Sequence, residues 1–271
     1  MSNPLPAALR DLSVPVPPGR TVTAEKGDPD TPVLWLTDAP ATGSLWSRLR
    51  AAHQGSGLWP VLLDHLDGDG GRPWDDGELW PEDCTDPAGH DPGGWLAVKW
   101  ADYTSTGEDD DMLSDAERVG VTAPFGQRWP GLADRCRLRV PPDPHADACA
   151  EELLRAQPHL RLGLVPADRS ADVPAVVGWE GAANFETDAG KLSAVLRSWE
   201  DRFGVRVIGL GFAELYVSVA APPATMDQAL RVAAEHFAFC PDNVWQERRP
   251  FTLAGYAARL VDSPLWTFWW D

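Results

Sequence analysis

Three residues near the C-terminus, His236, Cys240 and Asp242, have the types and spacing that acid–base or nucleophilic chemistry requires. His236 is expected at the edge of the apolar stripe of a helix, and Cys240 follows one helical turn later. Such a histidine could act as a general base or a metal ligand that Asp242 orients, and a Cys–His pair could form a nucleophile and its base. The alternative is a helix end in which Cys240 packs as a small apolar residue and Asp242 forms a turn.

A fourth candidate is Glu180, which follows Trp179 at the end of a predicted strand and precedes Gly181. Loops at the ends of strands often carry functional residues, so a catalytic or binding role for Glu180 stays open. The similar pair Trp199-Glu200 is expected to be structural. Trp199 lies on the apolar face of a predicted helix, which turns Glu200 towards solvent.

Tryptophan is used unusually often, with 14 Trp against 3 Tyr. Trp74, Trp80 and Trp129 occur in charged surroundings rich in Pro and Gly, where burial is hard to arrange. Exposed indole rings beside carboxylates suit a binding surface or a pocket for a cation. The same three residues could instead anchor loops to the core, because tryptophan is a large apolar side chain.

The formal net charge is −18, and the acidic residues are concentrated in two segments. Residues 64–93 contain ten acidic residues and one base, Arg72, and residues 102–117 contain seven acidic residues and no Lys or Arg. A nucleic-acid-binding protein needs the opposite sign of charge, and an anionic membrane surface is disfavoured for the same reason. The expected partner is therefore a basic protein or a cationic ligand, with no nucleic acid and no membrane.

Sequence motifs for metals, cofactors and secretion are absent. The four cysteines lack C-x-x-C spacing, and the acidic segment that begins at Asp64 fails the EF-hand pattern. No Gly-rich phosphate loop, G-x-S-x-G or H-E-x-x-H occurs. The N-terminus lacks the basic start and apolar core of a secretory signal. We therefore expect no metal, no cofactor and a cytoplasmic location.

The expected fold class is α+β, a mixed or antiparallel sheet with helices packed on it. Residues 1–32 are expected to form an extended arm. The predicted strands are 32–36, 58–63, 95–100, 173–179, 205–210, 215–219 and an edge strand at 265–270. The predicted helices begin near Thr42, Asp143, Asp188, Thr225 and Thr252.

These elements predict two parts. Residues 165–271 are expected to form a C-terminal β-α-β-β-α-α unit in which two helices cover the hairpin of residues 205–219. Residues 1–164 form an N-terminal strand-helix-strand region with long acidic loops, which could pack with the rest as one domain. Residues 32–63 and 174–210 both run strand, helix, strand, so an internal duplication stays open.

Three phrases in the C-terminal part carry a family resemblance. They are Glu235 to Gln246 (EHFAFCPDNVWQ), Trp199 to Gly204 (WEDRFG) and Trp266 to Asp271 (WTFWWD). Together they resemble the domain of unknown function 4253 family of bacterial proteins, over roughly residues 165–271. The resemblance implies that these residues form one unit, and it implies no activity.

The favoured hypothesis is a non-enzymatic binding or protein-interaction module with an acidic, Trp-rich surface. The alternative is a small-molecule hydrolase or transferase with a site formed by Glu180, His236 and Asp242. Geometry distinguishes the two hypotheses. The enzyme requires these three side chains to face one concave pocket within hydrogen-bond reach of each other.

Overall fold

A seven-stranded mixed sheet forms the centre of the protein, which confirms the expected α+β class. The computed structural model describes residues 4–25, 30–66, 71–105, 114–246 and 252–271. Within these ranges the strand order is β1-β2-β4-β3-β5-β6-β7, and the one parallel pair is β3 with β5. The strands are β1 (Gly19–Val22), β2 (Leu34–Pro40), β3 (Leu58–Leu63), β4 (Arg161–Pro166), β5 (Val205–Leu210), β6 (Glu214–Val219) and β7 (Leu265–Trp269).

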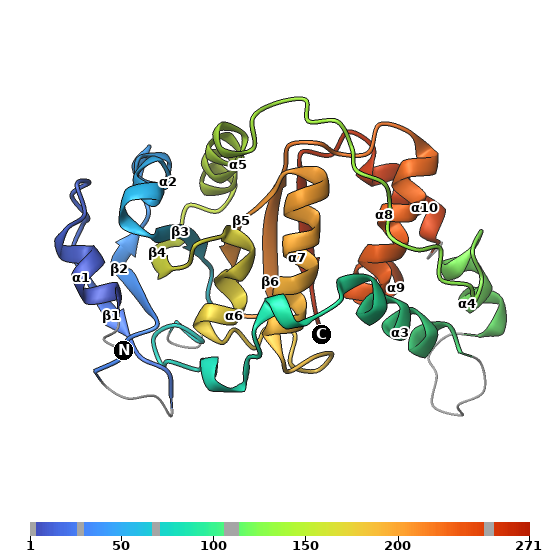
Figure 1. Ribbon diagram of the computed structural model, residues 1–271, viewed down its shortest axis with the longest axis horizontal. Coiled ribbons are helices and arrows are strands. Elements are labelled where there is room, and N and C mark those ends of the chain that lie inside the picture. The colour runs from blue at the N-terminus through green and yellow to red at the C-terminus, as the bar shows by residue number, and fades with distance from the viewer. Residues whose placement is uncertain (1–3, 26–29, 67–70, 106–113, 247–251) are drawn as a thin grey trace.

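Helices cover both faces of the sheet and its β7 end (Figure 1). Helices α2 and α5 pack on β3, β5 and β6, whereas α6 and α7 pack on β4 and β5. Helices α3, α4, α8, α9 and α10 gather beyond α7, on the right of Figure 1. The helices are α1 (Pro4–Arg10), α2 (Leu45–Ser56), α3 (Pro92–Thr104), α4 (Asp115–Thr122), α5 (Pro142–Ala156), α6 (Val173–Val177), α7 (Ala189–Phe203), α8 (Met226–Phe239), α9 (Asp242–Trp245) and α10 (Leu253–Leu260). In the described ranges, none of them combines the length and the apolar character that crossing a membrane would require.

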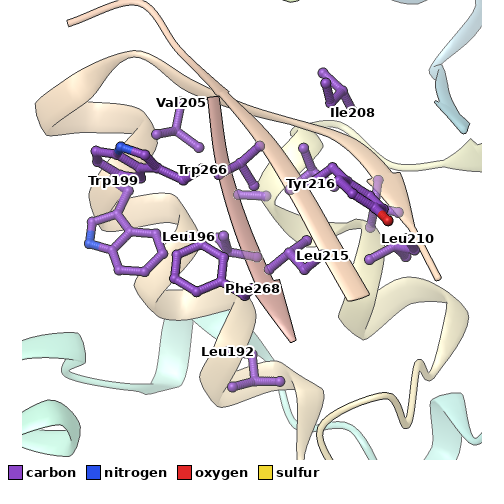
Figure 2. Packing of buried hydrophobic residues seen from close by; sticks show 14 of the residues in the cluster. Leu192, Leu196, Trp199, Val205, Ile208, Leu210, Leu215, Tyr216, Trp266 and Phe268 are labelled. Atoms are coloured by element: carbon purple, nitrogen blue, oxygen red, sulfur yellow. The ribbon is translucent and has the colours of Figure 1, made fainter. Parts of the chain in front are cut away.

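The core between α7 and the sheet is built from the stripe that the sequence predicts. Leu192, Leu196 and Trp199 point from α7 towards β7 (Figure 2), and the indole of Trp199 stacks on Phe268 at 5.3 Å between ring centroids. The hairpin of β5 and β6 is covered as expected. Asp188 caps the start of α7 by accepting a hydrogen bond from the Gly190 backbone at 2.9 Å, so this helix has local signals as well as a buried face.

Three predicted elements are wrong. Residues 95–100 are part of helix α3, because Asp91 caps the helix and Pro92 occupies its first turn. Residues 173–177 form helix α6, since a short apolar run fits a buried helix as well as a strand. The expected extended arm of residues 1–32 contains α1 and β1. Without a strand at 173–179, the segment 174–210 lacks the first strand of the strand-helix-strand unit on which the internal duplication depends.

Strand β4 was not predicted, and it takes a central place between β2 and β3. Gly163 in this strand leaves room for the Leu63 side chain of the neighbouring strand β3, because a Cβ at Gly163 would lie 2.7 Å from Cδ1 of Leu63. The expected boundary between residues 164 and 165 falls within β4, and strands from both parts of the chain share the one sheet.

A buried ion pair ties the long segment of residues 123–141, which runs over the top of Figure 1, to helices α7 and α8. Arg202 donates to both carboxylate oxygens of Glu235, at 2.8 and 2.6 Å. The same carboxylate accepts from Nε1 of Trp199 at 2.8 Å and from the Ala133 backbone at 2.6 Å. Arg202 also donates to the Ala133 carbonyl at 2.8 Å, so the N–H and the C=O of Ala133 are both hydrogen-bonded to the ion pair.

Candidate functional site

His236 lies in the interior rather than at the edge of the helix stripe, which corrects the expectation from the sequence. Its side chain is fully buried, and its ring is 4.5 Å from Trp266 and 4.8 Å from Phe268 between centroids. Nδ1 is 2.9 Å from the Tyr256 hydroxyl. Burial holds the pKa of His236 well below its ordinary value, so the ring is neutral at physiological pH.

Because His236 stays neutral when folded, acidification should destabilise the protein through this residue. The unfolded histidine binds a proton below about pH 6.5 and the folded one does not, so stability falls as pH falls. When the pH is lowered from 7.5 to 5.5, the free energy of unfolding should fall by about 1.4 kcal/mol more for the wild type than for His236→Gln. Denaturant unfolding at the two pH values measures this difference. An equal pH response of the wild type and His236→Gln would contradict the prediction.

Cys240 and Asp242 cap the open edge of strand β7. The Cys240 thiol donates to the Trp269 carbonyl at 3.0 Å, and Asp242 accepts from the Asp271 backbone at 3.1 Å. Asn243 accepts from the Trp269 backbone at 3.1 Å and donates to the Thr267 carbonyl at 2.7 Å. These side chains replace the neighbouring strand that an edge strand lacks. The contact joins two of the phrases that carry the family resemblance, EHFAFCPDNVWQ and WTFWWD.

The nucleophile–base pair is therefore not formed. His236 pairs with Tyr256, whereas the Cys240 thiol pairs with the Trp269 carbonyl, and burial raises the pKa of this thiol. Burial also raises the pKa of Asp242. Within the described ranges no three His, Cys, Asp or Glu side chains gather closely enough to hold a metal ion, and we assign none.

The three candidate tryptophans have different environments. Trp74 is buried and donates through Nε1 to the Asp64 carbonyl, which agrees with the loop-anchor alternative. Trp129 is half-buried and packs on Trp100 at 5.8 Å between centroids, as a loop anchor would. Trp80 is half-buried and lines a cavity.

This cavity brings Trp80 together with Glu180 in a volume of about 370 Å³. Its wall comes from the acidic loop of residues 71–80, the segment after α6, the β5–β6 turn and the C-terminal residues of the chain. The lining residues are Glu25, Arg72, Pro73, Glu78, Trp80, Glu180, Gly181, Ala183, Asn184, Phe212, Ala213, Trp270 and Asp271. We call it the acidic–aromatic cavity.

Glu180 is held at the cavity by the two residues that precede it. Trp179 is buried beneath it and donates through Nε1 to the Gly211 carbonyl at 2.8 Å. Gly178 has a φ of 70° and accepts a hydrogen bond from the Trp80 backbone at 2.9 Å. A Cβ at Gly178 would overlap the backbone of residues 80 and 81. This glycine therefore lets the Trp80 loop lie directly against the Glu180 segment.

The acidic loop is pinned to the sheet. Asp75 accepts from Arg161 of β4 at 2.6 Å and from Arg20 of β1 at 2.5 Å. Burial alone would raise the pKa of Asp75, but the two arginines outweigh it and hold the pKa below its ordinary value. This part of the acidic segment is thus anchored, and it carries Glu78 and Trp80 to the cavity.

The C-terminal residues complete the wall. The Trp270 backbone donates to the Ala213 carbonyl at 3.2 Å, and Asn184 donates to the Asp271 carbonyl at 2.9 Å. The Trp270 ring packs on Trp179 at 5.6 Å between centroids. Its Nε1 is buried and finds no hydrogen-bond partner among the residues that the structure describes.

The cavity combines negative charge with aromatic rings. Its acidic residues are Glu25, Glu78, Glu180 and Asp271, and its rings are Trp80, Phe212 and Trp270. The only basic residue among the described lining residues is Arg72, which donates to Glu78 at 2.7 Å and lies over the Phe212 ring at 5.3 Å. Carboxylates and ring faces both attract a cation, and a cleft concentrates their field.

The three residues of the alternative enzyme site do not converge. Glu180 lines the acidic–aromatic cavity, whereas Asp242 lines a separate, more open one beside Tyr256 and Trp266. His236 is packed behind Tyr256 and lines neither of these two cavities. A Glu/His/Asp site of this composition is therefore not assembled.

Sequence reasoning missed Arg72, Phe212, Trp270 and Asp271 as members of the site. Arg72 could have been singled out from the sequence, because it is the one Lys or Arg among the ten acidic residues of segment 64–93. Phe212 lies in the turn of the predicted hairpin, where a large apolar residue is unusual. Trp270 and Asp271 end the phrase that carries the family resemblance.

Comparison with known proteins agrees with that resemblance. Residues 161–271 match the family described as Domain of unknown function (DUF4253), and the match begins with the first residue of β4. No curated protein and no solved structure matches the chain.

Proposed function

We propose that this chain, whose residues 161–271 match the family described as Domain of unknown function (DUF4253), is a binding module that receives a positively charged group in its acidic–aromatic cavity. One observation carries the proposal. Four acidic residues and three aromatic rings line the same cavity, although they come from segments far apart in the sequence. The cationic group belongs to a small ligand or to a basic partner protein.

The size and charge of the cavity support a cation. Its volume of about 370 Å³ is sufficient for a basic side chain and lies at the lower end of small-molecule pockets. A cation between ring faces and carboxylates gains both electrostatic and cation–π stabilisation. The net charge of −18 would also speed the approach of a basic partner, and more so at low salt.

Binding rather than catalysis is favoured by the separation of the candidate catalytic groups. An acid–base site needs two or more groups within hydrogen-bond reach of a substrate. Here His236 is buried among aromatic rings, and the Cys240 thiol is engaged with the edge of β7.

Glu180→Gln should weaken the binding of a cationic probe about tenfold or more, because a charged hydrogen bond contributes about 1.5–3 kcal/mol. Isothermal titration calorimetry with N-acetyl-lysine methylamide and N-acetyl-arginine methylamide measures this loss. N-acetyl-norleucine methylamide, which is neutral, should bind weakly to both proteins.

Glu82→Gln is the matched control, because Glu82 is exposed, follows Trp80 closely and does not line the cavity. It removes the same charge and should leave the affinity within about twofold of wild type, since exposed charges are screened. If neither basic probe binds the wild type, or if Glu180→Gln and Glu82→Gln bind equally, the proposed function is wrong.

A further inference from the structure

The chain already places one guanidinium in the acidic–aromatic cavity. Nε of Arg72 donates to Glu78 at 2.7 Å, and the guanidinium carbon lies 5.3 Å from the centroid of the Phe212 ring. A planar guanidinium can stack on a ring while its N–H groups face a carboxylate, which a compact ammonium group cannot do. Arg72 thus shows which cation this part of the cavity accommodates.

The Arg72 side chain lies at the rim of the cavity. It is 35% exposed, and the hydrogen bond from Leu66 to residue 72 uses the Arg72 backbone carbonyl rather than the side chain. The loop itself is held by Asp75 and by the buried Trp74. A ligand could therefore displace the Arg72 side chain without moving the wall.

A second observation concerns Trp270, which is 97% buried and lines the same cavity. Its Nε1 is a hydrogen-bond donor that finds no acceptor in the described part of the chain. A buried donor without an acceptor costs about 1–3 kcal/mol, so a ligand that brings a carbonyl oxygen gains by pairing with it. The wall of the cavity thus contains an unsatisfied donor in addition to the groups that attract a cation.

We propose that the ligand of this cavity is an arginine residue within a peptide and that Arg72 is its internal competitor. The ligand guanidinium takes the position of Arg72 on Phe212, between Glu78 and Glu180, and the peptide carbonyl accepts from Nε1 of Trp270. This inference rests on the proposed function and names the ligand class of that site.

The first test compares affinities by calorimetry with N-acetyl-arginine methylamide. Arg72→Ala should bind this probe about tenfold more tightly than wild type, because a charged hydrogen bond and a ring contact no longer compete. Arg72→Lys keeps the positive charge but not the planar group that stacks on Phe212. Its affinity for the probe should therefore rise less than that of Arg72→Ala. Arg155→Ala removes an exposed arginine that pairs with Glu152 and does not line the cavity, so it should change the affinity less than twofold.

The second test examines the carbonyl. Wild type should bind N-acetyl-arginine methylamide more tightly than n-butylguanidinium, which has no carbonyl. Trp270→Phe removes the Nε1 donor and keeps a ring, so it should bind the two probes equally. Since that donor has no partner in the described residues, the folded state should tolerate the change.

The outcomes separate the two levels of the proposal. If N-acetyl-lysine methylamide binds wild type as tightly as the arginine probe, or if neither Arg72 variant raises the affinity, the ligand is a general cation and only this inference is wrong. If Trp270→Phe leaves the preference for the carbonyl probe unchanged, the peptide part of the inference is wrong. If no basic probe binds any of these proteins, the proposed function itself is wrong.

Discussion

Replacing Arg202 with alanine should lower the free energy of unfolding by about 3–5 kcal/mol, because it leaves the buried Glu235 carboxylate without its counter-ion. Glu235 is fully buried, and two of its four hydrogen bonds come from Arg202. The variant also loses the hydrogen bond to the Ala133 carbonyl, which holds the segment of residues 123–141. Urea unfolding followed by tryptophan fluorescence measures the change.

Arg155→Ala is the matched control, since Arg155 pairs with Glu152 on the surface, where the two side chains are 61% and 67% exposed. An exposed pair contributes less than about 1 kcal/mol. The prediction is contradicted if Arg202→Ala and Arg155→Ala destabilise the protein equally. A larger loss for Arg202→Ala would show that the ion pair joins α7, α8 and the crossing segment.

Gly178→Ala should both destabilise the protein and remove binding at the acidic–aromatic cavity. The left-handed backbone of Gly178 costs an alanine about 1–2 kcal/mol, and the overlap of its Cβ with the backbone of residues 80 and 81 adds about 1–3 kcal/mol. The new methyl group must push the Trp80 loop away from the Glu180 segment. The cavity then loses one wall, and calorimetry with N-acetyl-arginine methylamide should detect no binding.

Gly126→Ala is the matched control. It introduces the same left-handed backbone strain as Gly178→Ala, but it disturbs no contact with another segment. Gly126 has a φ of 58°, but a Cβ there would meet nothing within 4 Å. This variant should lose only about 1–2 kcal/mol and bind the probe as wild type does. Equal effects of the two substitutions on binding would show that the contact between Gly178 and the Trp80 loop does not shape the cavity.

Elements with strong local signals were predicted well. Helix α7 has a capping aspartate at Asp188, a one-sided apolar stripe and Gly204 in the left-handed conformation at its end. Strand β3 occupies the predicted residues 58–63 and is buried on both faces. The short apolar runs at residues 95–100 and 173–177 fit a strand as well as a helix, because a few apolar residues do not define a period. Asp91-Pro92 is the local signal that identifies the start of α3.

The site was predicted only in part. Glu180 and Trp80 were separate candidates, and the fold places both in one cavity. His236, the strongest chemical candidate, lies in the interior because Trp199 and Trp266 cover its ring. A helical wheel places a residue on one side of its own helix, and it contains no information on which other elements pack there.

The sequence by itself determined the α+β class, the capped helices, the β5–β6 hairpin and the excess of negative charge, because each depends on neighbouring residues or on a sum over the chain. Only the tertiary structure decided which acidic residues share a cavity with aromatic rings. Glu25, Glu78, Glu180 and Asp271 come from four distant segments, and their meeting depends on the pinning of the acidic loop to β1 and β4 and on the close approach at Gly178. Tertiary packing also decided that Cys240 and Asp242 cap an edge strand, because that edge exists only once β7 has joined the sheet.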